Sequence, residues 1–67
     1  MNIAKSVRVA TAMRGITQKQ MAALASINEV NLSKMINGKH GVSSEQLSRM
    51  AEAVDMKVSE FVALGED

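Results

Sequence analysis

Apolar residues recur at helical spacing in five separate runs along the chain. Residues three and four apart share one face of an α-helix, whereas strict alternation of apolar and polar residues marks a half-buried strand. The sequence has no run of the second kind, and it has no proline, internal repeat or linker. The pattern therefore predicts an all-α protein, a compact bundle of five short helices.

The first helix is predicted over residues 2–14 and ends at Gly15, a residue suited to a helix C-cap. Three apolar residues lie one above another on it: Ile3, Val7 and Ala10. Val9 and Met13 fall outside this stripe. We interpret them as part of a wider buried face in preference to a surface for a partner protein.

Residues 17–38 form the central unit, which is predicted to be two short helices joined by a tight turn. Thr17 and Gln20 have the spacing of a capping box, in which the two residues satisfy otherwise unpaired backbone N–H groups. Asn28 suits the N-cap of a second helix over residues 28–37. The residues expected to point inward are Met21, Leu24 and Ala25 in the first of these helices and Leu32, Met35 and Ile36 in the second.

The opposite face of the second helix carries the candidate chemistry. Val30, Lys34 and Asn37 point away from the apolar stripe at about 100° per residue. Glu29, Asn31 and Ser33 flank them. This face offers hydrogen-bond donors, an acceptor and a small apolar contact, a combination that suits the edges of DNA bases.

Two more helices are predicted in the remainder of the chain. Gly38 and Gly41 indicate a loop, after which Ser43 and Gln46 repeat the capping-box spacing. Leu47, Met50, Ala51 and Val54 form the stripe of this fourth helix. A fifth helix is predicted over residues 58–64, with these residues inward: Val58, Phe61, Val62 and Leu64.

Composition narrows the fold class and the cellular setting. We expect the 67 residues to form one domain with a small aliphatic core, because the chain holds six methionines but only one aromatic residue, Phe61. Without cysteine it has no disulfide or thiolate metal site, which fits a reducing compartment. No apolar run approaches the roughly 20 residues that span a bilayer. We therefore expect a cytoplasmic protein that needs no membrane.

The charges are divided unevenly although the net charge is only +1. Residues 1–39 hold six basic residues and one acidic residue, a net charge of +5, whereas residues 40–67 hold two basic and six acidic residues, a net charge of −4. Such a division lets one end of a protein approach phosphate while the other end stays away from it.

Other functions lack the residues that they need. A single histidine, His40, lies between Lys39 and Gly41, and there is no nucleophile motif or phosphate-binding glycine loop, so we do not expect an enzyme, a metal, a cofactor or a small-molecule ligand. Binding of single strands requires aromatic stacking platforms, and the one aromatic residue is on an apolar stripe.

Several of these positions together resemble the Cro/CI-type helix-turn-helix family of phage repressors and their bacterial relatives. The resemblance covers residues 7–62 and is carried by the following: Thr17, Gln18 and Ala22 in the first helix of the unit, Ile27 in the turn, Leu32 in the second helix, the 37–39 ending Asn-Gly-Lys, and the later spacing of Leu47, Met50, Ala51 and Val54. It implies a lambda repressor-like bundle whose third helix enters the major groove.

The resemblance also assigns roles to residues. It implies base contacts from Glu29, Val30, Asn31, Ser33 and Lys34, and contacts to the DNA backbone from Gln18, Lys19, Asn28, Asn37, Lys39 and His40. Glu29 either accepts from a cytosine amino group or repels phosphate, and Asn31 and Ser33 reach a base edge or a phosphate.

The chain departs from the family at two points. The usual glycine of the turn is Ser26, which would be strained by roughly 1 kcal/mol if the backbone there is left-handed. The frequent pair of a helix-one arginine and a helix-three glutamate is replaced by Thr11 and Ile36. Loss of both charges together can be nearly neutral, so the fold is expected to persist.

From these features we expect a regulator of transcription that binds double-stranded DNA sequence-specifically, with a Cro-like phage or prophage repressor favoured. One such unit reads few base pairs, so we expect a homodimer, weak in free solution, on a palindromic operator, with dimer contacts near residues 58–64 and the preceding loop. The alternative is a small protein-interaction module of the same fold, an antitoxin or anti-regulator whose main partner is a protein.

Overall fold

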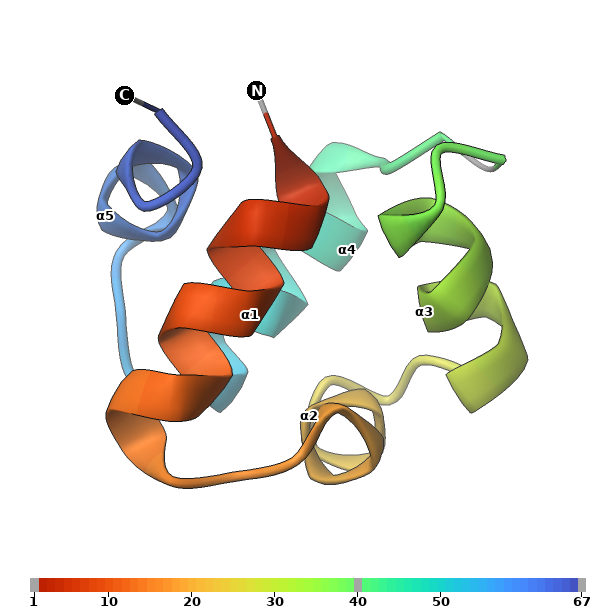
Figure 1. Ribbon diagram of the computed structural model, residues 1–67, viewed down its shortest axis with the longest axis horizontal. Coiled ribbons are helices and arrows are strands. Elements are labelled where there is room, and N and C mark those ends of the chain that lie inside the picture. The colour runs from red at the N-terminus through yellow and green to blue at the C-terminus, as the bar shows by residue number, and fades with distance from the viewer. Residues whose placement is uncertain (1, 40, 67) are drawn as a thin grey trace.

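The computed structural model describes residues 2–39 and 41–66, and in these two ranges it contains five helices and no strand. The helices are α1 (Ile3–Arg14), α2 (Gln18–Leu24), α3 (Glu29–Ile36), α4 (Ser44–Ala53) and α5 (Val58–Ala63). In Figure 1, α1 crosses the front of the bundle, with α5 on one side, α2 and α3 on the other, and α4 behind. The predicted all-α fold is confirmed.

Four helices begin at a side-chain cap that the sequence specifies. The Oγ1 of Thr17 accepts from the backbone N–H of Gln20 at 3.1 Å, while the Gln20 side chain accepts from the Thr17 N–H at 2.8 Å. Ser43 and Gln46 repeat this arrangement at the start of α4. Asn2 caps α1 and Asn28 caps α3. Each such cap stabilises its helix by about 1 kcal/mol.

Helices α1 to α4 end in the same way, with one residue in the left-handed region of φ. These residues are Gly15 (φ 67°), Ser26 (φ 56°), Gly38 (φ 73°) and Asp55 (φ 55°). After each of them, the next backbone N–H bonds to a carbonyl five residues earlier, as from Ile27 to Ala22 at 2.9 Å. This is the Schellman arrangement, which pairs carbonyls that a helix end leaves free and turns the chain sharply.

The core draws on all five helices and on the turn between α2 and α3. Its fully buried large side chains are Met21, Leu32, Met50, Val54 and Phe61. The smaller Ala10, Ala22, Ala25 and Ala51 are also buried, and they let the helices approach closely. The side chains of Leu32 and Met35 pack α3 into this core, with the half-buried Ile36 against its edge, and the opposite face of that helix is exposed.

Three predictions about apolar residues are wrong. Leu24 is 61% exposed because Met21, Ala22 and Ala25 define the buried face of α2, and Leu24 lies about 100° from the centre of that face. Met13, in the last turn of α1, is 58% exposed and does not belong to a wider buried face. Val58, the first residue of α5, is 38% exposed.

Candidate nucleic-acid interface

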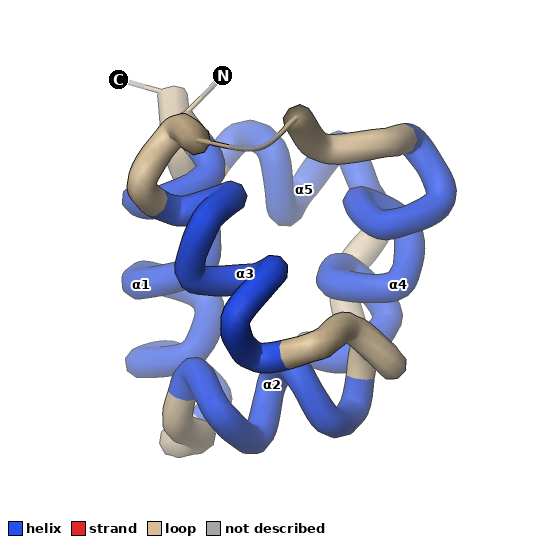
Figure 2. The backbone as a smooth tube through the Cα atoms, turned by 90° about the vertical axis from the view of Figure 1, so that its right-hand side faces the viewer, coloured by secondary structure: helices blue, strands red, loops and turns tan. Residues whose placement is uncertain are grey.

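Helix α3 follows α2 after a four-residue connection, and the turn fixes how the two helices lie. Ser26, in the left-handed conformation, redirects the chain, and Ile27 is buried behind it. Figure 2 shows α3 in front of the bundle, with α1 on one side, α4 on the other and α2 below. Residues 17–38 therefore form the helix-turn-helix that the sequence predicts, with one face of α3 turned outward.

The outward face of α3 borders a shallow hollow. Six residues line it: Glu29, Val30, Ser33, Lys34, Asn37 and Lys39. Four of the five candidate base-contacting residues are among them. Val30 is 61% exposed, although Leu32 and Met35 on the other face of the same helix are 0% and 3% exposed. The hollow thus combines one apolar side chain with a carboxylate, a hydroxyl, an amide and two ammonium groups.

Asn31 and Asn28 are placed differently from the other candidates on this helix. Asn31 is exposed but does not border the hollow. The side-chain oxygen of Asn28 accepts from the backbone N–H of Val30 at 2.8 Å and from that of Asn31 at 3.4 Å. This cap leaves only the amide NH₂ of Asn28 available for a contact outside the protein.

The candidates for backbone contacts lie at both ends of the unit. Gln18 and Lys19 are exposed in the first turn of α2, whereas Asn37 and Lys39 follow α3 and border the hollow. The backbone N–H of Lys39 donates to the carbonyl of Lys34 at 2.9 Å, which holds this end of the unit in place. His40, the remaining candidate, lies outside the described residues.

One of the basic residues in the N-terminal half serves the fold. The Nε of Arg14 donates to the carbonyl of Val54 at 2.7 Å. The charge of Arg14 is therefore held at the end of α4 and not beside α3. Sequence reasoning missed this role because the basic residues of α1 look alike in the sequence, and the partner of Arg14 is forty residues away.

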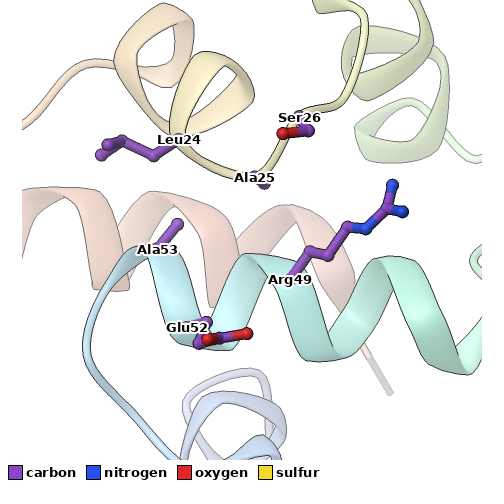
Figure 3. Close-up of a pocket in the computed structure, with 6 residues that line it drawn as sticks. All are labelled: Leu24, Ala25, Ser26, Arg49, Glu52 and Ala53. Atoms are coloured by element: carbon purple, nitrogen blue, oxygen red, sulfur yellow. The ribbon is translucent and has the colours of Figure 1, made fainter.

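A second hollow lies between the end of α2 and α4, on another side of the helix-turn-helix. Leu24, Ala25 and Ser26 line one wall, and Arg49, Glu52 and Ala53 line the other (Figure 3). Arg49 forms an ion pair with Glu45 one turn earlier on α4. The exposed Leu24 faces solvent here, and the polar groups of this hollow are fewer than those beside α3.

Within the part of the chain that the structure describes, every helix is too short or too polar to pass through a lipid bilayer.

Comparisons with known proteins agree with this geometry. The model of the Cro/C1-type helix-turn-helix (HTH) DNA-binding domain matches residues 7–67. The competence pilus inhibition repressor of Acinetobacter baylyi is 33% identical over 67 residues, all of this chain and 61% of that protein. The chain therefore spans about three-fifths of the length of this relative.

Two crystal structures share the fold. The restriction-modification controller protein C.AhdI from Aeromonas hydrophila matches with a TM-score of 0.80 at 20% identity, over 90% of this chain and 91% of that one. The clp gene regulator ClgR from C. glutamicum matches with a TM-score of 0.82 at 23% identity, over 96% of this chain and 83% of that one.

A helical bundle in which α2, a tight turn and α3 leave one face of α3 exposed is the architecture of a helix-turn-helix DNA-binding domain. The chain belongs to the family of Cro/C1-type HTH DNA-binding domains, as the resemblance in the sequence implies. The matched family model describes a DNA-binding domain, so the chain is a DNA-binding domain of that type.

Proposed function

We propose that α3 lies in the major groove of double-stranded DNA and reads its sequence through the outward face. The observation that carries this proposal is the exposure of Val30 on the outward face of α3, beside the charged and polar residues that line the same hollow. An apolar side chain in this position gains free energy if a contact made on binding removes it from water. The methyl group of thymine supplies such a contact in the major groove.

Each neighbour of Val30 has a matching chemistry. Lys34 donates to the O6 or N7 of guanine, and Glu29 accepts from the amino group of cytosine. Ser33 and Asn31 reach a base edge or a phosphate from the two flanks of the helix. Because all of these side chains leave one short helix, a single docking position presents them to a few consecutive base pairs.

The backbone contacts come from residues on either side of α3. Gln18 and Lys19 at the start of α2, the amide of Asn28, and Asn37, Lys39 and His40 after α3 are proposed to meet phosphate oxygens. Such contacts fix the position of the helix without reading sequence. The excess of basic residues in positions 1–39 supports this assignment.

We further propose that residues 1–67 act as one domain that binds a palindromic operator as a homodimer, weak in free solution. A two-fold operator needs two copies of α3 about one helical turn apart. The half-exposed Val58 supports a dimer contact in residues 58–64 and the preceding loop. The relative named as a repressor supports repression of transcription, which we place in the bacterial cytosol, and the match to the Cro/C1-type family supports a Cro-like phage or prophage regulator.

A second candidate function is an interaction with a protein, as in an antitoxin or anti-regulator. The exposed Met13 and Leu24 favour it, because both are large apolar side chains outside α3. Salt separates the two functions. Binding through 6 to 10 phosphates loses roughly 10³ to 10⁵ in affinity between 50 and 200 mM salt, whereas an apolar protein interface changes little.

The first experiment is a titration of labelled mixed-sequence duplex with the protein across that range of salt. Sedimentation then measures how many protomers bind an operator duplex recovered by selection from a random pool. The proposal predicts a steep loss of affinity with salt and two protomers on an operator duplex. If the protein does not bind duplex even at low salt, DNA is excluded as its partner. A single protomer on operator DNA, or a tight tetramer in free solution, would contradict the weak dimer.

A further inference from the structure

A narrow groove lies where α1, α2 and α3 meet. It is separate from the hollow beside the outward face of α3, which we call the base-facing hollow. It encloses about 200 Å³ and is lined by Ala4, Val7, Arg8, Thr11, Gln18 and Ile36. Ala4, Val7 and Ile36 make its walls apolar. Its three polar side chains are those of Arg8, Thr11 and Gln18, and they come from two different helices.

The hydroxyl of Thr11 is already used inside the protein. Its Oγ1 lies 2.8 Å from the carbonyl of Val7 and 3.1 Å from that of Arg8, so its single proton is directed into α1. Arg8 and Gln18 differ from it, since both are exposed and neither side chain forms a hydrogen bond or ion pair with any residue in 2–39 or 41–66. The groove therefore presents two free sets of N–H donors.

The groove borders the side of α3 along which a DNA strand would run. Ile36 lines the groove and Ser33, one turn earlier on α3, lines the base-facing hollow. Residues three apart on a helix share a side, so the two concave regions adjoin along one flank of α3. A helix that fills a major groove about 12 Å wide has a phosphate strand on each flank.

We propose that this groove binds one phosphate of the DNA backbone, with the guanidinium of Arg8 and the amide of Gln18 as donors. This inference rests on the proposed function, and it adds Arg8 to the residues assigned there. Arginine suits the position because its planar group donates two parallel hydrogen bonds to a phosphate.

Salt dependence of binding tests the charge at position 8. The variant Arg8→Ala is compared with Arg49→Ala, which removes the same charge from α4, where Arg49 is paired with Glu45 and lies outside the proposed DNA and dimer contacts. We expect Arg8→Ala to lower affinity for a mixed-sequence duplex roughly tenfold at low salt. It should also reduce the slope of log affinity against log salt by about one, and Arg49→Ala should leave both quantities unchanged.

A second measurement locates the phosphate. Single phosphates of a bound duplex are replaced by neutral methylphosphonates, one position at a time. At one position in each half-site, the replacement should weaken binding by the wild type and leave the already weakened Arg8→Ala variant unaffected. For both measurements, thermal melting of the wild type and of Arg8→Ala verifies that the exposed side chain of Arg8 contributes nothing to the stability of the fold.

The possible outcomes separate this inference from the proposed function. If the wild type binds duplex with a steep salt dependence and Arg8→Ala has the same slope and affinity, the groove is not a phosphate site although the DNA-binding function stands. The same holds if no methylphosphonate position couples to Arg8. If the wild type shows no salt-dependent affinity for any duplex, the proposed function and the groove both fail.

Discussion

The Nε of Arg14, in the last turn of α1, lies 2.7 Å from the carbonyl oxygen of Val54 at the end of α4. A terminal nitrogen of the same guanidinium lies 3.4 Å from the carbonyl of Asp55. The last carbonyls of a helix have no partner within it and carry partial negative charge, so a cation there is favourable. Arg14 thereby joins two helices that are far apart in sequence and helps to hold the chain where it turns towards α5.

Arg14→Met should therefore destabilise the fold, because the substitution retains the apolar stem but removes every donor. We expect a loss of about 1 to 2 kcal/mol in the free energy of unfolding, measured by urea denaturation. Arg8→Met is the matched control on the same helix, and it should change stability by less than about 0.5 kcal/mol. Equal stability of the two variants would show that the bond to Val54 contributes nothing.

The turn of the helix-turn-helix contains backbone strain that a single substitution can relieve. Ser26 has a φ of 56°, in the region that costs a residue with a Cβ about 1 kcal/mol or more. Ser26→Gly should raise the free energy of unfolding by about 0.5 to 1 kcal/mol, less than the full strain because glycine also loses more chain entropy. Thermal melting should show a rise of about 3 to 6 °C.

Ser26→Ala is the control for that prediction, since alanine keeps the Cβ and should give no comparable gain. A decrease in stability for Ser26→Gly would mean that the serine side chain stabilises the turn by more than its strain.

The chain after α5 passes closely over the start of α1. A Cβ added to Gly65 would lie 2.4 Å from the carbonyl oxygen of Asn2 and 2.6 Å from the Oγ of Ser6. Gly65→Ala must displace this segment, and overpacking of this kind costs about 1 to 3 kcal/mol. Gly41→Ala, where a Cβ meets nothing within 4 Å, is the control and should be nearly neutral in the same denaturation experiment. Unchanged stability of Gly65→Ala would show that the contact is dispensable.

The sequence predicted those features that depend on neighbouring residues. The capping boxes at Thr17 and Ser43 need only a partner three residues away, and the spacing of apolar residues locates all five helices. Spacing within the central unit also predicted which side of α3 faces outward. Leu32 and Met35 lie on the buried side, so Val30 and Lys34 lie on the opposite, outward side. The roles of these outward residues in binding DNA stay predictions.

Features that depend on how distant segments pack were missed. The exposure of Leu24 follows from the angle at which α2 meets the core, and an apolar stripe three turns or fewer in length leaves that angle undetermined. The bond from Arg14 to Val54 and the groove beside Arg8 each require the positions of several helices. No spacing in a single sequence distinguishes an arginine that caps a distant helix from one that is free to bind phosphate.

The central claim is that the outward face of α3 reads base pairs. It is tested most directly by selection of bound duplexes from a random pool at near-physiological salt, carried out with the wild type and with Lys34→Ala. We predict that the wild type enriches a palindrome with half-sites one helical turn apart. Lys34→Ala should lose preference at one base pair of each half-site, at a cost of about 1 to 3 kcal/mol. No enrichment by the folded wild type, or the same preferences in both proteins, would contradict the claim.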